Sequence, residues 1–164
     1  MKILLTGHRG FIGSNLLQRL QQNHQVDTYE WSDGIRPGVI DYDWVIHIGA
    51  ISSTTERDIE KIMRQNVDFT IDLFEECRTF GVGFQFASSA SIYGLGIDFN
   101  EATAKPDPRN PYAWSKYLCE RHIRADQRSI PTQVFRYFNV YGAGEDHKGN
   151  QASPYTQFLS LIHI

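Results

Sequence analysis

The chain has 164 residues, a length that fits one domain, and its 41% hydrophobic and 21% charged residues are ordinary for a globular protein. A net charge of −3 gives no basic surface for nucleic acid, and no apolar run reaches the roughly 20 residues that span a membrane. The two cysteines, Cys77 and Cys119, form neither a metal motif nor a disulfide framework. We therefore expect a cytoplasmic protein without a nucleic-acid or membrane partner.

Strand-like and helix-like segments alternate along the chain, as in an α/β fold with a parallel sheet. In chain order we expect strands at 2–6, 25–31, 44–48, 82–87 and 132–138, and helices at 11–22, 59–80, 111–128 and from Ser153 onward. Residues 31–42 are too few for a further strand and a crossover helix. The prediction is a Rossmann-type doubly wound sheet whose strand–helix unit after the second strand is shortened or absent, leaving a bare or otherwise covered sheet edge.

Three glycines follow the first strand and open the first helix. Gly7 permits a tight turn, Gly10 allows a pyrophosphate to approach the backbone, and Gly13 allows the helix to pack on the sheet. The free N–H groups of this helix start favour an anion. Glu30 ends the second strand, 17 residues after Gly13, and its carboxylate can accept the ribose hydroxyls of NAD. The pattern predicts a dinucleotide site.

Tyr112 and Lys116 lie four residues apart on one predicted helix and therefore share a face. A phenol is a weak base at neutral pH, but a neighbouring ammonium favours its ionised form and lowers its pKa. Ser89 lies near the carboxyl end of the fourth strand, where open α/β sheets bind ligands. We expect Ser89 to hold the substrate oxygen with which Tyr112 exchanges a proton.

Together these motifs resemble, in order and spacing, the extended short-chain dehydrogenase/reductase family of nucleotide-sugar epimerases and dehydratases. The resemblance covers essentially the whole chain and also includes the segment 136–142. Within the family, the segments 52–56, 87–90 and 147–149 are most similar to the ADP-glyceromanno-heptose 6-epimerases. The resemblance implies an enzyme that removes hydride from a sugar carbon and returns it to the other face, with NAD or NADP tightly bound.

The resemblance also implies roles for individual residues. Lys148 is the second proton donor beside Tyr112, Lys116 and Ser89, and the nucleotide sugar is bound by Ser52, Ser89 and Asn139. The cofactor is bound by Gly7, Gly10, Phe11, Ile12, Gly13, Glu30, Arg36, Gly49, Ala50, Ile51, Asn66, Tyr112, Lys116 and Val140.

Several alternatives stay open in the sequence. Glu30 favours NAD because a carboxylate repels a 2′-phosphate, whereas Arg36 can assist NADP, and Arg9 can reach a phosphate or point to solvent. Another 4-epimerase, 4,6-dehydratase or reductase of the family is the alternative activity, and a non-catalytic dinucleotide-binding fragment is a third. We expect residues 1–164 to be the dinucleotide-binding domain, with the usual C-terminal substrate domain absent or truncated, and expect a homodimer.

Overall fold

The computed structural model describes residues 1–126, 129–142, 144–145, 153–155 and 157. Within them, five parallel strands form one sheet in the order β2-β1-β3-β4-β5. The strands are β1 (Lys2–Thr6), β2 (Gln25–Tyr29), β3 (Trp44–His47), β4 (Gly83–Ser89) and β5 (Thr132–Tyr137). The predicted Rossmann-type doubly wound sheet is confirmed.

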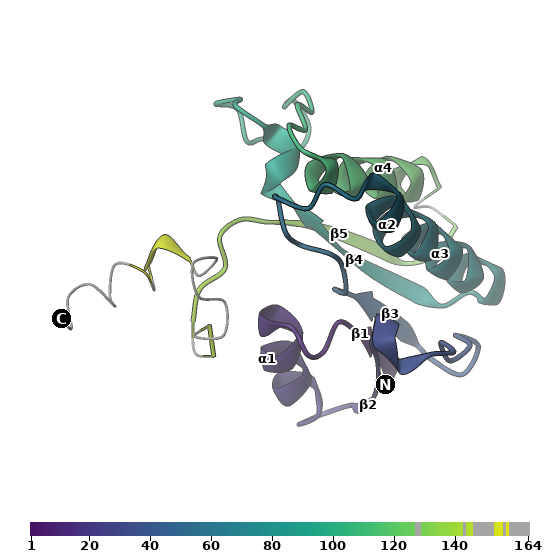
Figure 1. Ribbon diagram of the computed structural model, residues 1–164. Helices are drawn as coiled ribbons and strands as arrows, with labels where there is room; N and C mark the ends of the chain where they lie inside the picture. The colour runs from purple at the N-terminus through teal and green to yellow at the C-terminus, as the bar shows by residue number, and fades with distance from the viewer. Residues whose placement is uncertain (127–128, 143, 146–152, 156, 158–164) are drawn as a thin grey trace.

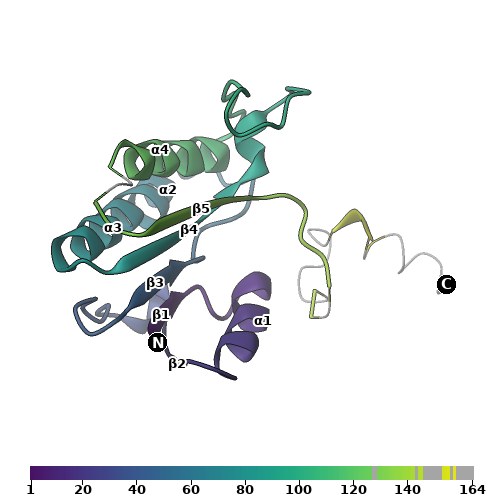
Figure 2. The ribbon, with the colours of Figure 1, turned by 180° about the vertical axis from the view of Figure 1, so that it is seen from behind.

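The helices cover both faces of this sheet (Figure 1). One face carries α1 (Phe11–Leu20), and the other carries α2 (Ile59–Ile62), the π-helical turn η2 (Met63–Asp68), α3 (Phe69–Phe80) and α4 (Pro111–Ala125), as the reverse view also shows (Figure 2). Asn110 caps α4 by accepting the Ala113 N–H at 2.8 Å, and Gly81 ends α3 at φ +71°. Across the described segments, none of the helices is long and apolar enough to cross a bilayer.

Two apolar layers hold the helices on the sheet, because successive strand side chains point to opposite faces. Leu4, Val45 and Phe84 join the layer under α3 and α4, where Phe74 and Ile123 are also buried. The opposite layer is smaller and contains Ile3, Leu5 and Ile46 beneath the α1 residues Leu16, Leu17 and Leu20. Strands covered on both faces explain the nearly continuous apolar runs in the sequence.

The connection between β2 and β3 is as short as its length predicts. One 3₁₀ turn, η1 (Trp31–Asp33), follows β2, which therefore ends at Tyr29 instead of residue 31. Among the described residues, β2 pairs with β1 alone and lies at the edge of the sheet. The strand–helix unit after β2 is thus absent from this part of the chain.

The single helix predicted at 59–80 is interrupted by η2. Apolar spacing does not reveal this turn, because Met63, Val67, Ile71 and Phe74 keep helical steps of three or four residues across it. Asn66 is buried at the turn, and Thr70 Oγ1 donates a hydrogen bond to the Asn66 carbonyl. Such π-turns frequently mark functional sites. Smaller differences occur at element ends: α1 stops at Leu20, and β4 continues to Ser89.

Candidate functional site

Glycine is needed for a different reason at each of the three glycine positions in the turn after β1. Gly7 has φ +77°, and a Cβ there would lie 2.4 Å from the Gly49 nitrogen. A Cβ on Gly13 would lie 2.0 Å from the Gly7 carbonyl oxygen. At Gly10, however, a Cβ would meet only that oxygen, at an ordinary 3.5 Å. The protein's own packing therefore requires Gly7 and Gly13, whereas glycine at position 10 leaves room for a group outside the protein.

Three adjoining cavities run along the carboxyl ends of the strands. The first, of about 130 Å³, is lined by aromatic and glycine residues including Tyr29, Trp31, His47 and Phe69. The second, of about 270 Å³, is lined by all three glycines of the turn with Tyr112 and Lys116. The third, of about 770 Å³, is lined by the residues Gly10, Phe11, Ile12, Ser52, Ser53, Thr54, Thr55, Ser89, Tyr112, Tyr137, Phe138, Asn139, Val140, Glu145, Ser153 and Pro154. Shared lining residues join each cavity to the next.

Glu30 stands where the first and second cavities meet. Its Oε1 accepts the Arg9 backbone N–H at 2.6 Å, which fixes the carboxylate against the glycine turn. Tyr29 and Trp31 flank it in sequence, and both rings contact Phe69, with centroids 5.8 and 5.3 Å away respectively. An acidic group beside a small aromatic hollow is suited to the ribose and the base of an adenosine.

The loop after β3 forms the shared wall of the cavities. Asn66 holds it from η2: its Oδ1 accepts the Ile51 N–H at 2.8 Å, and its Nδ2 donates to the Ile51 carbonyl at 3.0 Å. The same Nδ2 donates to Ser115 Oγ at 3.1 Å, between Tyr112 and Lys116 on α4. Asn66 thus ties the loop to the helix that carries the Tyr–Lys pair.

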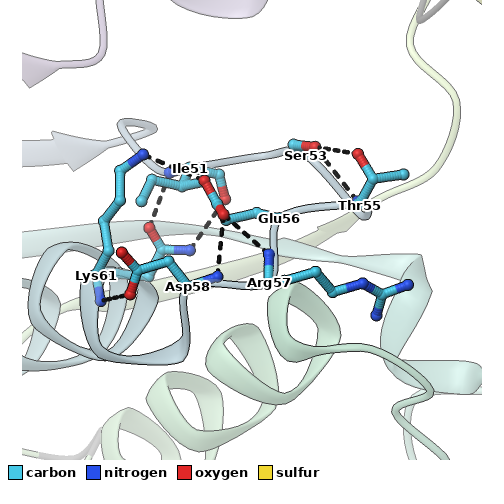
Figure 3. A network of polar contacts seen from close by, with 8 residues as sticks. Ile51, Ser53, Thr55, Glu56, Arg57, Asp58 and Lys61 are labelled. Atoms are coloured by element: carbon cyan, nitrogen blue, oxygen red, sulfur yellow. Dashed lines mark hydrogen bonds and ion pairs between the residues drawn. The ribbon is translucent and has the colours of Figure 1, made fainter.

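Farther along this loop, Glu56 organises the backbone (Figure 3). Its carboxylate accepts the N–H groups of Asp58 and Arg57 at 3.0 and 2.8 Å and the Lys61 ammonium at 3.2 Å. The hydrogen bond from Asp58 is the largest influence that lowers the pKa of Glu56. Asp58 in turn caps α2 through the Lys61 N–H. These contacts order the polypeptide that follows the cavity-lining segment 52–55.

A buried chain of hydrogen bonds braces the same region from below. His47 Nε2 lies 2.8 Å from Thr70 Oγ1, and Nδ1 lies 2.6 Å from Thr6 Oγ1, which also accepts the Gly49 N–H at 3.3 Å. Thr70 Oγ1 already donates to Asn66, so it accepts from Nε2–H, and Nδ1 accepts from Thr6. Burial, with the charges of Lys116 and Arg36, lowers the pKa of His47 to about 3. The ring is therefore neutral.

Tyr112, Ser89 and Lys116 converge between α4 and the end of β4. Tyr112 and Ser89 both line the third cavity, where Ser89 is near enough to favour the ionised form of the phenol. The Lys116 Nζ donates to the Ala87 carbonyl at 2.8 Å and lies 5.9 Å from the centre of the Tyr112 ring. The predicted grouping of these three residues is what the structure shows, and Asn66 supports it from behind.

The pKa values of the pair reflect burial. Burial raises the pKa of Tyr112 above its usual value, and the nearby Ser89 hydroxyl opposes the change by favouring the ionised form. The expectation that Lys116 lowers the Tyr112 pKa does not hold in this state, since the ammonium is turned to Ala87. Burial lowers the pKa of Lys116 to about 8. The phenol is thus protonated at neutral pH, and the lysine can exchange a proton more readily than a surface lysine.

One turn further along α4, Glu120 secures the helix to the strand. It is 2% exposed and accepts from Ser88 Oγ at 2.7 Å, from Arg136 Nε at 3.0 Å and from Arg136 Nη2 at 2.6 Å. Arg124 Nε lies 2.9 Å away. Lys116 and Glu120, four residues apart on α4, therefore bond to Ala87 and Ser88 of β4, and Tyr112 lies one turn earlier on the same face. This register places the phenol beside the serine.

The structure brings most of the predicted residues to the cavities. Asn139 and Val140 line the third cavity, and Ser52 lies between the second and third. Arg36 is an exception: it lines none of these three cavities, and it is paired with Glu76 on α3. Lys148 lies outside the described residues. Asn66 acts on the loop and lines no described cavity.

Sequence reasoning missed three contributors. Glu145 is 1% exposed at the third cavity and accepts both the N–H and the Oγ–H of Ser153 at 2.8 Å. The role of Glu120 and the hydrogen-bond partners of the buried His47 were also not predicted, because the residues involved lie far apart in sequence. The sequence features that point to them are a histidine in a strand predicted to be buried, His47, and an acidic residue four positions after Lys116 on the same helix, Glu120.

Comparison with known proteins agrees with this geometry. The sequence model of the NAD dependent epimerase/dehydratase family matches residues 38–163. The ADP-L-glycero-D-manno-heptose-6-epimerase of Pseudomonas paraeruginosa is 36% identical over 182 aligned positions, which cover 93% of this chain and 55% of that protein. The chain thus spans about half the length of the curated relatives it matches.

Two solved structures share the fold. The ADP-L-glycero-D-manno-heptose-6-epimerase of Helicobacter pylori superposes with a TM-score of 0.83 at 26% identity, over 95% of this chain and 61% of that chain. The UDP-glucuronic acid 4-epimerase of Bacillus cereus, solved in complex with NAD, has a TM-score of 0.75 at 28% identity, over 87% of this chain and 57% of that chain. With the family match covering most of its length, the chain belongs to the NAD-dependent epimerase/dehydratase family.

Proposed function

We propose that this chain binds NAD and carries the hydride-transfer site of a nucleotide-sugar epimerase, most similar to the ADP-heptose 6-epimerases. The observation that carries the proposal is the convergence of Tyr112, Ser89 and Lys116 beside the cavity walled by the glycine turn. The similarity to heptose epimerases of Pseudomonas and Helicobacter supports the choice of sugar.

The residues present fit a dinucleotide. Gly10 is free of internal packing, so its backbone can be approached by the pyrophosphate, together with Phe11 and Ile12 at the start of α1. Glu30 would hold the ribose hydroxyls beside the aromatic hollow. The other proposed contacts are Gly7, Gly13, Gly49, Ala50, Ile51, Tyr112, Lys116 and Val140, with Asn66 acting through Ile51. NAD, when bound, would accept hydride from the sugar carbon and return it.

The chain's own residues would handle the proton. Ser89 would orient a substrate hydroxyl toward the Tyr112 oxygen, and Tyr112 would exchange a proton with it. A positive charge must approach the phenol before it gives up its proton, because burial alone raises its pKa. Lys116 supplies that charge if its ammonium turns from Ala87 toward the tyrosine and the ribose. Lys148 stays the proposed second proton donor.

The third cavity is the proposed sugar site. Its volume of about 770 Å³ suits a ligand of this size, and hydroxyl and amide groups from Ser52, Ser89 and Asn139 line it. A nucleotide sugar presents many hydroxyls that require such partners. These residues are therefore the proposed substrate contacts.

The test is conversion of purified ADP-heptose 6-epimers by the protein with NAD. The expected result is interconversion by the native sequence, and loss of turnover with retained NAD binding in Tyr112→Phe. Absence of interconversion despite bound NAD would reject the heptose assignment, and a product from a UDP-, GDP- or dTDP-sugar would indicate another reaction of the family. Turnover by Tyr112→Phe equal to that of the native protein would reject the role of Tyr112.

We also propose a cytoplasmic homodimer that associates through α2 and α4. Ile59 is 62% exposed and Trp114 is 49% exposed, and with Met63 and Pro108 they line an apolar hollow of about 350 Å³. Free buried thiols at Cys77 and Cys119 fit a reducing compartment. A monomeric mass by light scattering would contradict the dimer, and Trp114→Glu should convert dimers to monomers.

A further inference from the structure

The adenosine end of the site contains an unusual balance of charge. Glu30 lines both the first and the second cavity. Two arginines lie close by. The backbone N–H of Arg9 donates a hydrogen bond to Glu30, and the Arg36 guanidinium lies 5.9 Å from the centre of the ring of Phe69, which lines the first cavity. Either cation is a candidate partner for a phosphate on the adenosine ribose. Whether the site accepts that phosphate depends on what the two guanidiniums already bind.

Arg9 is held by η1. Its Nη2 donates to Asp33 Oδ1 at 2.7 Å, and its Nη1 donates to Ser32 Oγ at 3.2 Å. Asp33 is itself fixed, because its Oδ2 accepts the Glu30 N–H at 2.7 Å. Asp33 and Ser32 therefore each occupy a donor of the Arg9 guanidinium, and releasing these donors to an external anion would disturb the turn that follows β2.

Arg36 is held from α3. Its Nη2 donates to Glu76 Oε2, and its Nη1 donates to the Pro37 carbonyl at 3.1 Å. Glu76 also accepts the Val39 N–H at 2.9 Å through Oε1. The Arg36 and Glu76 side chains are only 20% and 24% exposed, so solvent screens this pair less than the pair of Arg9 and Asp33.

We infer that Asp33 and Glu76 make this site selective for NAD over NADP by occupying the two arginines that would otherwise bind a 2′-phosphate. The inference rests on the proposed function and names the determinant of its cofactor preference. Three carboxylates, Glu30, Asp33 and Glu76, accompany the two guanidiniums, so these five side chains together carry a net negative charge. Both acidic residues act through their arginines and are positioning residues. Glu30 alone would repel the 2′-phosphate. The ion pairs Arg9–Asp33 and Arg36–Glu76 also prevent the two arginines from offsetting this repulsion by binding the phosphate.

The experiment measures dissociation constants of NAD and NADP for the purified chain by calorimetry, in low-salt buffer at pH 7.5. We expect NAD to bind at least about tenfold more tightly than NADP, equivalent to about 1.4 kcal/mol. Asp33→Asn and Glu76→Gln keep the side-chain shape and remove one charge each. Each should tighten NADP binding by about fivefold while NAD binding stays within about twofold, and the double variant should bring the two affinities close together.

Two control variants separate specificity from general effects. Glu101→Gln removes one negative charge in the exposed loop before α4 and should leave the NADP/NAD ratio unchanged. Adding Arg9→Met to Asp33→Asn should abolish the gain in NADP affinity. The inference is overturned if the native chain binds NADP as tightly as NAD, or more tightly. It is also overturned if Asp33→Asn and Glu76→Gln change the dissociation constants of NAD and NADP by the same factor. Failure of the folded chain to bind either cofactor overturns the proposed function and the inference with it.

Discussion

Replacing Glu120 with Gln is expected to destabilise the fold by about 3 kcal/mol at pH 7. The Glu120 side chain is 3% exposed and that of Arg136 is 7% exposed, so the charge of Arg136 would be left buried without its counter-charge. Glutamine keeps the shape but presents an amide donor to a guanidinium that also donates. Removing one partner of a buried pair typically costs about 3–5 kcal/mol, and Arg124, which is partly exposed, offsets little of it.

Urea unfolding followed by circular dichroism measures this cost, and an m-value of about 2 kcal/mol/M converts it to a midpoint shift of about 1.5 M. Burial raises the pKa of Glu120, but the hydrogen bonds from Arg136 and Ser88 outweigh it and hold the pKa below its usual value. The contribution is therefore complete above the unfolded pKa of about 4.3 and declines as the pH falls through the lower folded value. A difference below about 1 kcal/mol at pH 7, or one that grows on acidification, would refute this reasoning.

Three further predictions concern stability. Gly13→Ala should cost about 1–3 kcal/mol because its Cβ would overlap the Gly7 backbone, whereas Gly10→Ala should change the unfolding free energy by less than about 0.5 kcal/mol; equal costs in urea titrations would contradict the distinction. The pKa of Lys116 is about 8 in the folded protein, so above that pH the unfolded chain binds more protons than the native state. The free energy of unfolding of the native sequence should therefore rise by about 2 kcal/mol between pH 7.5 and 9.5, measured relative to Lys116→Met. The pKa of His47 is about 3 in the folded protein, so between pH 7 and 5 the unfolded chain takes up a proton that the native state does not. The free energy of unfolding should therefore fall by about 2 kcal/mol over this range relative to His47→Gln. Parallel pH profiles of the two proteins would refute the neutral, buried state of His47.

The sheet and the central motif could be predicted from local sequence signals. A strand ending just before Gly7, a helix starting after Gly10 and an acidic residue at position 30 are linked by short-range rules of chain geometry. Tyr112 and Lys116 share a face because helices have a fixed period. The short connection after β2 followed from residue count alone. These features depend on residues that are near each other in sequence.

The bracing of the site could not be predicted, because it depends on contacts between distant segments. Glu120 meets Ser88 across 32 positions, and Arg36 meets Glu76 across 40. Nothing near Arg36 in sequence reveals that a carboxylate on α3 holds it. The turn η2 was missed because the apolar residues on either side of it keep helical steps of three or four.

The direction in which the Tyr112 pKa moves was also wrong in the sequence interpretation. A lysine four residues away was expected to lower it, but the ammonium bonds the Ala87 carbonyl, and burial raises the tyrosine value. Helical spacing places two side chains on one face without determining their rotamers or their solvation. The pair shares a face as predicted, but its electrostatics depend on what occupies the cavity.

Titration of the purified chain with NAD by calorimetry tests the central claim most directly, using Gly10→Asp as the site variant and Gln18→Asp, on the exposed side of α1, as the matched control. We expect saturable one-to-one binding by the native chain and by Gln18→Asp, and loss of binding by a folded Gly10→Asp, whose carboxylate would face the pyrophosphate. A folded native chain that shows no saturable NAD binding, or a Gly10→Asp variant that binds NAD as tightly as the native chain, would contradict this claim.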